Sequence, residues 1–314
     1  MDFDKDTVEF LEALDSGTRK IYSCGLAAFQ EFYKQQGTIK DFLDRVEEDS
    51  LRSRRDKQRV ARNTLKEFLE WLHGKGYKSK TVRAYVAAVQ SEAKYFDLPI
   101  STRYVDVPVG KPFSQKYPWT IDDISKFVSM IGKPIHKAIA VSIFQSGLGI
   151  SDLLALTYGD IQHEFEQGVV PICLDLARIK TDVPFMTFIG DWGVSLLKQH
   201  LAGNSLKPED RLFRITSSAV DGYFERLARK FVGEYQGNNP IRPHSLRAAF
   251  CTLLSDHKVN PLYIEFWMGH HVAEQQRVYV SKSREGWRET YRTQAEPWLT
   301  PSFRSRKNNV EHAS

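Results

Sequence analysis

Three short stretches in the second half of the chain hold residue types that suit chemistry at a phosphate. A His-x-x-Arg motif occupies positions 244–247, a Gly-His pair occupies 269–270, and Tyr279 follows nine residues after that pair. Lys180 stands earlier, in a short polar segment. A guanidinium group offers a planar fork of donors to phosphate oxygens, a phenol can form a phosphate ester, and an ammonium group can supply a proton. These residue types predict a reaction at a phosphodiester.

A further stretch, Gln145-Ser-Gly-Leu-Gly-Ile-Ser-Asp152, reads as a helix end, a turn and a helix that restarts at Ser151. In order and spacing, these motifs resemble the catalytic domain of the tyrosine recombinases, the family of phage-type integrases and Xer-type enzymes. The resemblance covers roughly residues 112 to 296. Each motif is weak alone, but a lysine turn, His-x-x-Arg, Gly-His and a tyrosine in this order are specific together.

The resemblance implies a role for each of these residues. Tyr279 matches the nucleophile, which forms a 3′-phosphotyrosyl bond with DNA. Arg247 matches the arginine that holds the scissile phosphate, and His244 matches the histidine of the same motif. His270 matches a second histidine position that supports the phosphate or the tyrosine. Lys180 matches the general acid at the strand turn.

The chemistry of strand exchange fits these residue types. Cutting and resealing DNA without a high-energy cofactor requires the phosphodiester energy to be kept in a covalent bond to the enzyme. Charge then builds on the non-bridging oxygens, where arginine donors stabilise it. The sequence shows no convincing spacing of metal ligands, so no metal, ATP or other cofactor is expected.

One position departs from the family pattern. Gly149 stands where the family has its first catalytic arginine. Loss of one such donor typically lowers the rate by a factor on the order of 10²–10³. Three explanations stay open: an impaired catalyst, an altered sequence, or an arginine supplied from elsewhere, for which Arg178 and Arg242 are candidates. Ala248, where many relatives carry a basic residue, is a smaller departure.

Each candidate catalytic residue could instead have a purely structural role. A lone histidine is usually structural, and the paired motifs are what favour a functional role for His244 and His270. Lys180 is the least specific assignment, because lysines at strand turns are usually just solvated. Tyr263 and Tyr291 are rival nucleophiles that rank below Tyr279.

The elements expected around these residues are mostly helices. Apolar residues recur at helical spacing from about residue 18 to 95 and predict four or five helices, one of them beginning at Ser79-Lys-Thr81, where a hydroxyl can cap the first turn. Three prolines within positions 98–112 indicate a linker. Thr120 can cap the first helix of a second domain. Positions 168–189 are rich in β-branched and aromatic residues and predict a small antiparallel sheet with Lys180 at its turn.

The expected fold class is therefore mostly α with a small antiparallel β-sheet. The domains expected are a helical core-binding domain over 1–98, a linker over 99–114, a catalytic domain over 115–300 and a flexible basic tail over 301–314.

Positive charge is concentrated in the first of these domains. The chain of 314 residues has 44 Lys+Arg against 39 Asp+Glu, a net charge of +5. Two runs of basic residues could neutralise DNA phosphates, although a solvated helix face is the alternative. The first run is Arg52, Arg54, Arg55, Lys57, Arg59 and Arg62, and the second is Lys75, Lys78, Lys80 and Arg83.

The sequence also excludes several classes of protein. No stretch is apolar enough for a transmembrane helix, the N-terminus lacks a secretion signal, and three widely spaced cysteines argue against a disulfide framework. The expectation is an intracellular recombinase that acts on double-stranded DNA as a homotetramer. The alternatives are a catalytically silent DNA-binding descendant, a type IB topoisomerase-like enzyme and, less favoured, a helical protein-interaction module.

Overall fold

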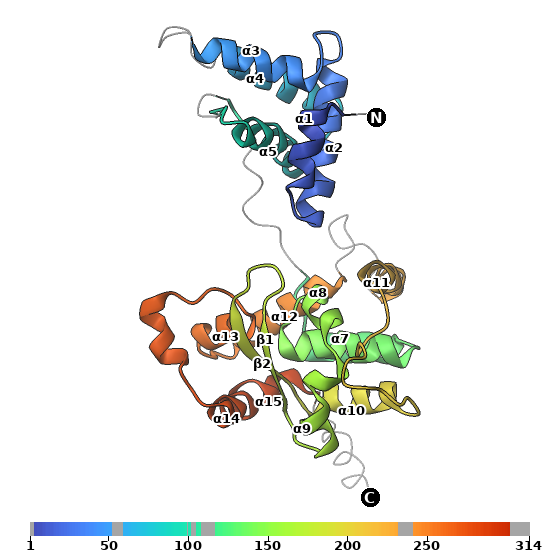
Figure 1. Ribbon diagram of the computed structural model, residues 1–314. Coiled ribbons are helices and arrows are strands. Elements are labelled where there is room, and N and C mark those ends of the chain that lie inside the picture. The colour runs from blue at the N-terminus through green and yellow to red at the C-terminus, as the bar shows by residue number, and fades with distance from the viewer. Residues whose placement is uncertain are drawn as a thin grey trace, which may run out of the picture. The chain divides into compact units, whose positions relative to one another are not determined.

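The computed structural model describes residues 3–51, 59–98, 100–101, 105–107, 117–231 and 241–301, without the side chains of Arg277 and Tyr279. The chain forms two compact units, Met1–Ser114 and Gln115–Ser314 (Figure 1). Helices dominate both units, and the described strands form one two-stranded antiparallel sheet. The predicted fold class is confirmed.

The first unit is a helical bundle. Its described helices are α1 (Lys5–Glu12), α2 (Ser16–Tyr33), α3 (Ile39–Ser50), α4 (Arg59–Gly74) and α5 (Ser79–Tyr95). The ring of Phe29 lies at the centre, with its centroid 5.0 Å from that of Phe42 and 5.1 Å from that of Phe68. Both ring pairs meet edge to face, the arrangement that aromatic quadrupoles favour. Helices α2, α3 and α4 are therefore joined through one aromatic cluster.

Helix α5 begins where the sequence predicts, but without the expected hydroxyl cap. It starts at Ser79 after Lys78, and no side chain caps it. The carbonyl oxygen of Lys78 instead accepts from the backbone N–H groups of Thr81, at 2.8 Å, and Val82, at 3.0 Å. The hydroxyl groups of Ser79 and Thr81 both lie inside the first turn rather than at the cap position.

The second unit surrounds helix α7 (Pro134–Ser146), which is buried from Ala138 to its end. Before α7 comes α6 (Ile121–Met130), which begins with the predicted Thr120 cap: Thr120 and Asp123 exchange side-chain and backbone hydrogen bonds. The elements that follow are α8 (Ile150–Ala155), η1 (Tyr158–Asp160), α9 (Gln162–Glu166), β1 (Ile172–Ala177), β2 (Pro184–Ile189), α10 (Asp191–Leu201), α11 (Ser217–Phe231), α12 (Pro243–Asp256), α13 (Pro261–Trp267), η2 (Glu274–Val280), α14 (Arg284–Gln294) and α15 (Glu296–Leu299).

The predicted hairpin is present and lies between α13 and α7 (Figure 1). Its register runs from Ile172 opposite Ile189 to Ala177 opposite Pro184, so residues 178–183 form the turn. Helices α10 and α12 pack against α7. This arrangement brings the end of α7, the hairpin, α12 and α13 into one neighbourhood. No described helix is long and apolar enough to cross a membrane.

Candidate active site

The first turn of α12 carries the His-x-x-Arg motif. Pro243 occupies the first helical position, where the N–H that proline lacks would have no helical partner. His244 and Arg247 are three residues apart and therefore lie on one face of the helix. His244 is exposed, whereas the Arg247 residue is only 5% exposed. The buried arginine must find its partners inside the protein.

Arg247 joins three distant segments of the second unit. Its Nη1 donates to the carbonyl oxygen of Gly147, at the end of α7, and its Nη2 donates to the carbonyl oxygen of Met268 at 2.9 Å. The same Nη2 lies 2.9 Å from Nε2 of His270. Gly147 has a φ of 66°, and an added Cβ there would lie 2.7 Å from the Phe250 ring. The glycine is what lets the α7 end approach α12 closely enough for this bond.

The hydrogen bonds of His270 define its tautomer. A guanidinium group can only donate, so Nε2 of His270 must accept from Arg247 with a lone pair. The proton of the neutral ring is then on Nδ1, which donates to Oε2 of Glu265 at 2.5 Å. The His270 side chain is 42% exposed. Glu265 and Arg247 therefore hold a neutral imidazole in one orientation at the surface.

A second guanidinium lies beside that of Arg247. Arg178 is the first residue after β1, and its Nη1 donates to the Met268 carbonyl oxygen at 2.8 Å. Its Nε lies 3.3 Å from Oδ2 of Asp152, a carboxylate on α8 whose side chain is 8% exposed. Gly269 has a φ of 66°, and a Cβ added there would lie 2.7 Å from Cδ of Arg178. The missing side chain at Gly269 leaves room for the stem of Arg178.

The two guanidinium groups change the electrostatics of the site. Burial, reinforced by the positive charge of Arg178, lowers the pKa of Arg247 to about 10, and the nearby carboxylate of Asp152 opposes this shift. Arg247 therefore still carries its charge at neutral pH. Among the described residues Arg178 pairs with Asp152 and Arg247 forms no ion pair, so the two adjacent cations can bind an anion.

Lys180 lies on the hairpin turn, as predicted, and is exposed. The turn is fixed at both ends: the N–H of Arg178 donates to the carbonyl oxygen of Val183 at 3.0 Å, and the N–H of Ile179 donates to Oδ1 of Asp152 at 3.1 Å. Within the described part of the chain, the Lys180 ammonium makes no hydrogen bond or ion pair. It is thus solvated and lies two residues from Arg178.

Tyr279 lies in η2, which packs against α13, the helix that ends just before the Gly-His pair. Its side chain is outside the described part of the structure. Val280 beside it is 8% exposed and anchors the segment in the core. The backbone of the proposed nucleophile is therefore attached to the element that carries His270.

The two rival tyrosines are engaged in packing. Tyr291 is completely buried, its hydroxyl donates to the carbonyl oxygen of Gln145 at 2.8 Å, and burial raises its pKa well above the ordinary value. The ring of Tyr263 lies 5.1 Å from that of Trp287 and beneath the Lys282 ammonium, 4.3 Å from its centroid. These contacts argue against both as nucleophiles.

Gly149 lies immediately before α8, at a φ of −73° and ψ of 153°, a conformation open to any residue. The helix starts at Ile150 rather than at Ser151, and no side chain caps it. A Cβ added to Gly149 would lie 3.0 Å from Oδ2 of Asp152. Arg242, the other candidate replacement, is exposed at the start of α12, and in the described residues its guanidinium bonds to neither Arg247 nor His270.

The sequence did not predict a role in this site for two carboxylates, Asp152 and Glu265. Asp152 follows Gly149 by three residues, so both lie on one face of a helical turn, a spacing that could have signalled it. Glu265 precedes His270 by five residues and had no comparable signal. Both hold positively charged or donating side chains in place.

The basic residues predicted to contact DNA lie partly in the described structure. The second run is exposed around the connection between α4 and α5: Lys75, Lys78, Lys80 and Arg83. Of the first run, Arg59 is exposed and Arg62 is half-buried on α4. The other four residues of that run lie outside the described residues: Arg52, Arg54, Arg55 and Lys57. The ammonium of Lys75 pairs with Glu31 at 2.9 Å and lies 4.9 Å from the centroid of the Trp71 ring. Among the described residues, the second run is the more exposed one.

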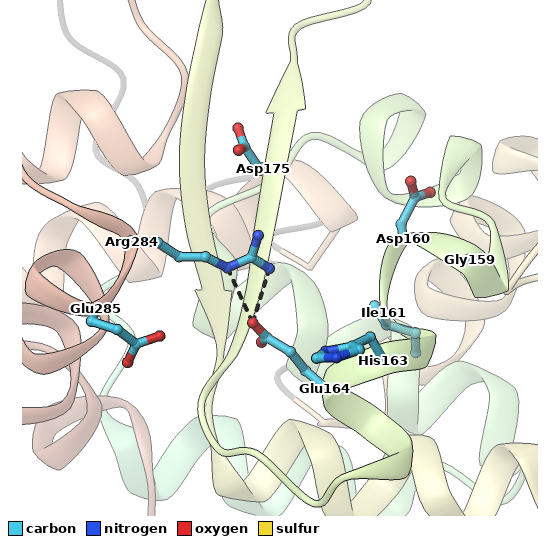
Figure 2. Close-up of a pocket in the computed structure, with 8 residues that line it drawn as sticks. All are labelled: Gly159, Asp160, Ile161, His163, Glu164, Asp175, Arg284 and Glu285. Atoms are coloured by element: carbon cyan, nitrogen blue, oxygen red, sulfur yellow. Dashed lines mark hydrogen bonds and ion pairs between the residues drawn. The ribbon is translucent and has the colours of Figure 1, made fainter.

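A separate cavity of about 570 Å³ lies in the second unit (Figure 2). It is lined by Gly159, Asp160, Ile161, His163, Glu164, Asp175, Arg284 and Glu285, and by none of the predicted catalytic residues. Burial opposes ionisation of Glu164, but bonds from Arg288, at 2.6 Å, and from the Cys173 N–H outweigh it and lower the pKa of Glu164. Arg284 adds an ion pair at 2.9 Å. These pairs hold the start of α14, and the acidic lining does not suit a phosphate.

Comparison with known proteins places these features in a family. Residues 120–285 match the family model of the phage integrases, which covers more than half of the chain. The chain belongs to this family, the tyrosine recombinases.

Individual relatives agree with that assignment. Tyrosine recombinase XerD of Ralstonia nicotianae is 25% identical over 158 residues, 48% of this chain and 49% of the relative, so that match spans about half of the relative's length. Tyrosine recombinase XerD of Pseudomonas aeruginosa is 23% identical over 242 residues, 72% of this chain and 78% of the relative.

Solved structures share the fold at low identity. A lambda integrase dimer bound to a COC′ core site has a TM-score of 0.58 and 14% identity, with 89% of this chain and 93% of that chain covered. XerH recombinase bound to its difH substrate has a TM-score of 0.57 and 19% identity, with 86% and 78% covered.

Proposed function

We propose that this protein is a site-specific DNA recombinase that cuts and rejoins strands through a 3′-phosphotyrosyl bond at Tyr279, without metal or ATP. The observation that carries the proposal is the buried Arg247 guanidinium, bonded to His270 at the end of the helix against which the Tyr279 segment packs. The arrangement of these residues and the chain's membership of the phage integrase family both support cleavage and rejoining of DNA strands.

In the cleavage step, Tyr279 gives up its phenolic proton, for which His244 is the proposed acceptor, and its oxygen attacks the phosphorus while the bond from phosphorus to the 5′-oxygen breaks. The leaving 5′-oxygen takes a proton from Lys180. Arg247 and His244 donate to the non-bridging oxygens as their charge increases, and His270, whose Nε2 accepts from Arg247, holds that guanidinium in place. In rejoining, a 5′-hydroxyl attacks the phosphotyrosine and Tyr279 leaves, so no external energy source is consumed.

DNA is the proposed partner of both units. The exposed basic residues between α4 and α5 suit phosphate contacts, and the similar lambda integrase and XerH structures contain DNA. Residues 1–98 serve as the core-binding domain and residues 115–300 as the catalytic domain. Four copies bring two DNA sites together for exchange.

The test is covalent trapping on a pool of nicked duplexes with randomised sequence. The nick lets the 5′-hydroxyl fragment dissociate, so that protein–DNA adducts accumulate and can be sequenced. Wild-type protein and a Tyr263→Phe control should form adducts, and Tyr279→Phe should form none. Adducts that persist in Tyr279→Phe would overturn the proposal.

A catalytically silent DNA-binding protein is the second candidate, favoured by Gly149. It predicts salt-dependent DNA binding with no adduct from any member of the pool. A topoisomerase-like enzyme would instead relax supercoiled plasmids that lack the trapped sequence.

A further inference from the structure

We propose that Arg178 is a second phosphate-binding residue of this active site, supplying from the hairpin turn the guanidinium group that position 149 lacks. The inference rests on the proposed function for the identity of the phosphate. The arrangement of Arg178 around Met268, Gly269 and Asp152 is what points to it.

Arg178 and Arg247 bind one acceptor. Both donate to the carbonyl oxygen of Met268, at 2.8 and 2.9 Å, so their guanidinium groups lie side by side although the residues come from the hairpin and from α12. His270, which is bonded to Arg247, follows Met268 by two residues. Arg178 thus lies within the cluster that includes Arg247 and His270.

The donors of Arg178 are only partly used by the protein. A guanidinium has five N–H donors. Within the described residues, one Nη1 donor binds Met268, Nε faces Asp152 without a well-directed hydrogen bond although it is buried, and Nη2 binds no protein atom. A phosphate oxygen would supply the acceptor that Nη2 lacks. The same planar fork fits two oxygens of one phosphate.

Arg247 forms no ion pair with a carboxylate among the described residues, and this leaves a place for an anion. Two guanidinium groups share a largely buried site, and Asp152 is the carboxylate that pairs with Arg178. The other nearby carboxylate, Glu265, accepts from His270. Repulsion between the two cations would be relieved by a bound phosphate.

Position 149 and Arg178 approach the same carboxylate oxygen. A Cβ on residue 149 would lie 3.0 Å from Oδ2 of Asp152, and Nε of Arg178 lies 3.3 Å from that atom. A side chain that starts at residue 149 would therefore approach the carboxylate that pairs with Arg178, although no atom of Arg178 lies within 4 Å of its Cβ.

The alternative is that Arg178 only attaches the hairpin to the end of α13. Rescue by an arginine from another position separates the two roles. Arg178→Ala should lower the rate of adduct formation on the trapped DNA by about 10²-fold or more. Adding Gly149→Arg to Arg178→Ala should restore at least a tenth of the wild-type rate, because the new side chain places a guanidinium at the same carboxylate.

Arg292→Ala is the matched control. Arg292 also donates to a backbone carbonyl, that of Val170 just before β1, at 2.8 Å, so it fastens the opposite end of the strand. Its loss should leave the rate within a factor of about two. If Arg178→Ala is as active as this control, or if it is inactive and Gly149→Arg restores nothing, the inference is wrong.

A second measurement does not depend on Tyr279. Orthovanadate can adopt the five-coordinate geometry of the phosphoryl-transfer transition state. Its binding at low concentration should therefore raise the melting temperature of the wild-type protein and of the Arg292→Ala variant. The shift should be lost in Arg178→Gln and return with Gly149→Arg. A full vanadate shift in a folded Arg178→Gln protein overturns the inference, whereas adducts in Tyr279→Phe overturn only the proposed function.

Discussion

Arg178 and Arg247 donate to a single carbonyl oxygen, that of Met268, from elements that are far apart in the chain. A helix end normally leaves its last carbonyl groups without helical partners. Here the carbonyl group just after α13 accepts from two arginines instead, and it thereby fixes both cations next to His270. The site is therefore assembled on a backbone oxygen rather than on an acidic side chain alone.

Gly269→Ala should displace Arg178 and reduce catalysis. A Cβ at this position would lie 2.7 Å from Cδ and 2.8 Å from Cγ of Arg178, and the φ of 66° adds backbone strain of about 1 kcal/mol. We expect adduct formation to fall by at least about tenfold, approaching the loss in Arg178→Ala. The measurement is the rate of adduct formation on the trapped DNA.

Gly168→Ala provides the control for strain alone. Gly168 has nearly the same φ, 68°, but no atom lies within 4 Å of an added Cβ. Its variant should lose only the stability that backbone strain accounts for, and it should keep its adduct rate. Equal rates in the two variants would show that the contact between Gly269 and Arg178 is unimportant.

Glu265 should act by orienting His270. Glu265→Ala removes the acceptor for Nδ1–H, and the loss of a hydrogen bond to a charged group should slow adduct formation by about 10- to 100-fold. Glu265→Gln keeps an oxygen acceptor and should retain most of the rate. DNA affinity, measured by fluorescence anisotropy, should be unchanged in both. An Ala variant as fast as the Gln variant would contradict the assigned tautomer.

The sequence predicted the parts of this site that lie within one element. The His-x-x-Arg motif identified His244 and Arg247 as a pair, and β-branched residues located the hairpin with Lys180 at its turn. The order of the motifs also predicted that Arg247 and His270 would meet, and 2.9 Å separates their nitrogens. Catalysis by these residues stays a prediction.

The position of Arg178 could not be chosen from the sequence. Arg178 and Arg242 were equal candidates, because both lie beside a motif. Arg178 differs from Arg242 in contacts with residues about 90 positions away in the sequence. The carbonyl group of Met268 accepts a hydrogen bond from Arg178, and Gly269 leaves room for its side chain. Such packing depends on backbone conformation at several places, which no local pattern encodes.

Glu92 should make the first unit less stable as the pH rises. Its side chain is fully buried on α5, and burial raises its pKa from 4.5 to about 7, although a bond from Thr7 Oγ1 at 2.6 Å opposes this. The folded state keeps the proton that the unfolded chain loses, so stability should fall between about pH 4.5 and 7, by about 3 kcal/mol in all. Amide hydrogen exchange of α5 measures this stability in the full chain.

Glu92→Gln should remove most of that pH dependence, because a neutral amide can still accept from Thr7. Glu67→Gln, a change at an exposed glutamate of α4, should keep it. Exchange rates of α5 in the Glu92→Gln protein that still rise between pH 5 and 8, after correction for intrinsic exchange, would show that another group is responsible.

The exposed lysines between α4 and α5 should contribute to DNA affinity through phosphate contacts. Replacing Lys78 and Lys80 by Ala removes two cations that are exposed in the structure. If both contact phosphates, the slope of log affinity against log salt should decrease in magnitude by about 1.8, at about 0.9 for each contact. Fluorescence anisotropy of a labelled duplex over a salt series measures this slope.

Lys40→Ala is the matched control for that experiment. Lys40 is an exposed lysine of the same unit, but its ammonium is already paired with Asp6 at 3.0 Å and lies 3.9 Å from Asp44. It should therefore contribute little to counterion release, and its variant should keep the wild-type slope. A slope that is unchanged in the Lys78 and Lys80 variant, or reduced equally by Lys40→Ala, would mean that this run of lysines is a solvated helix surface and that DNA binds the first unit elsewhere.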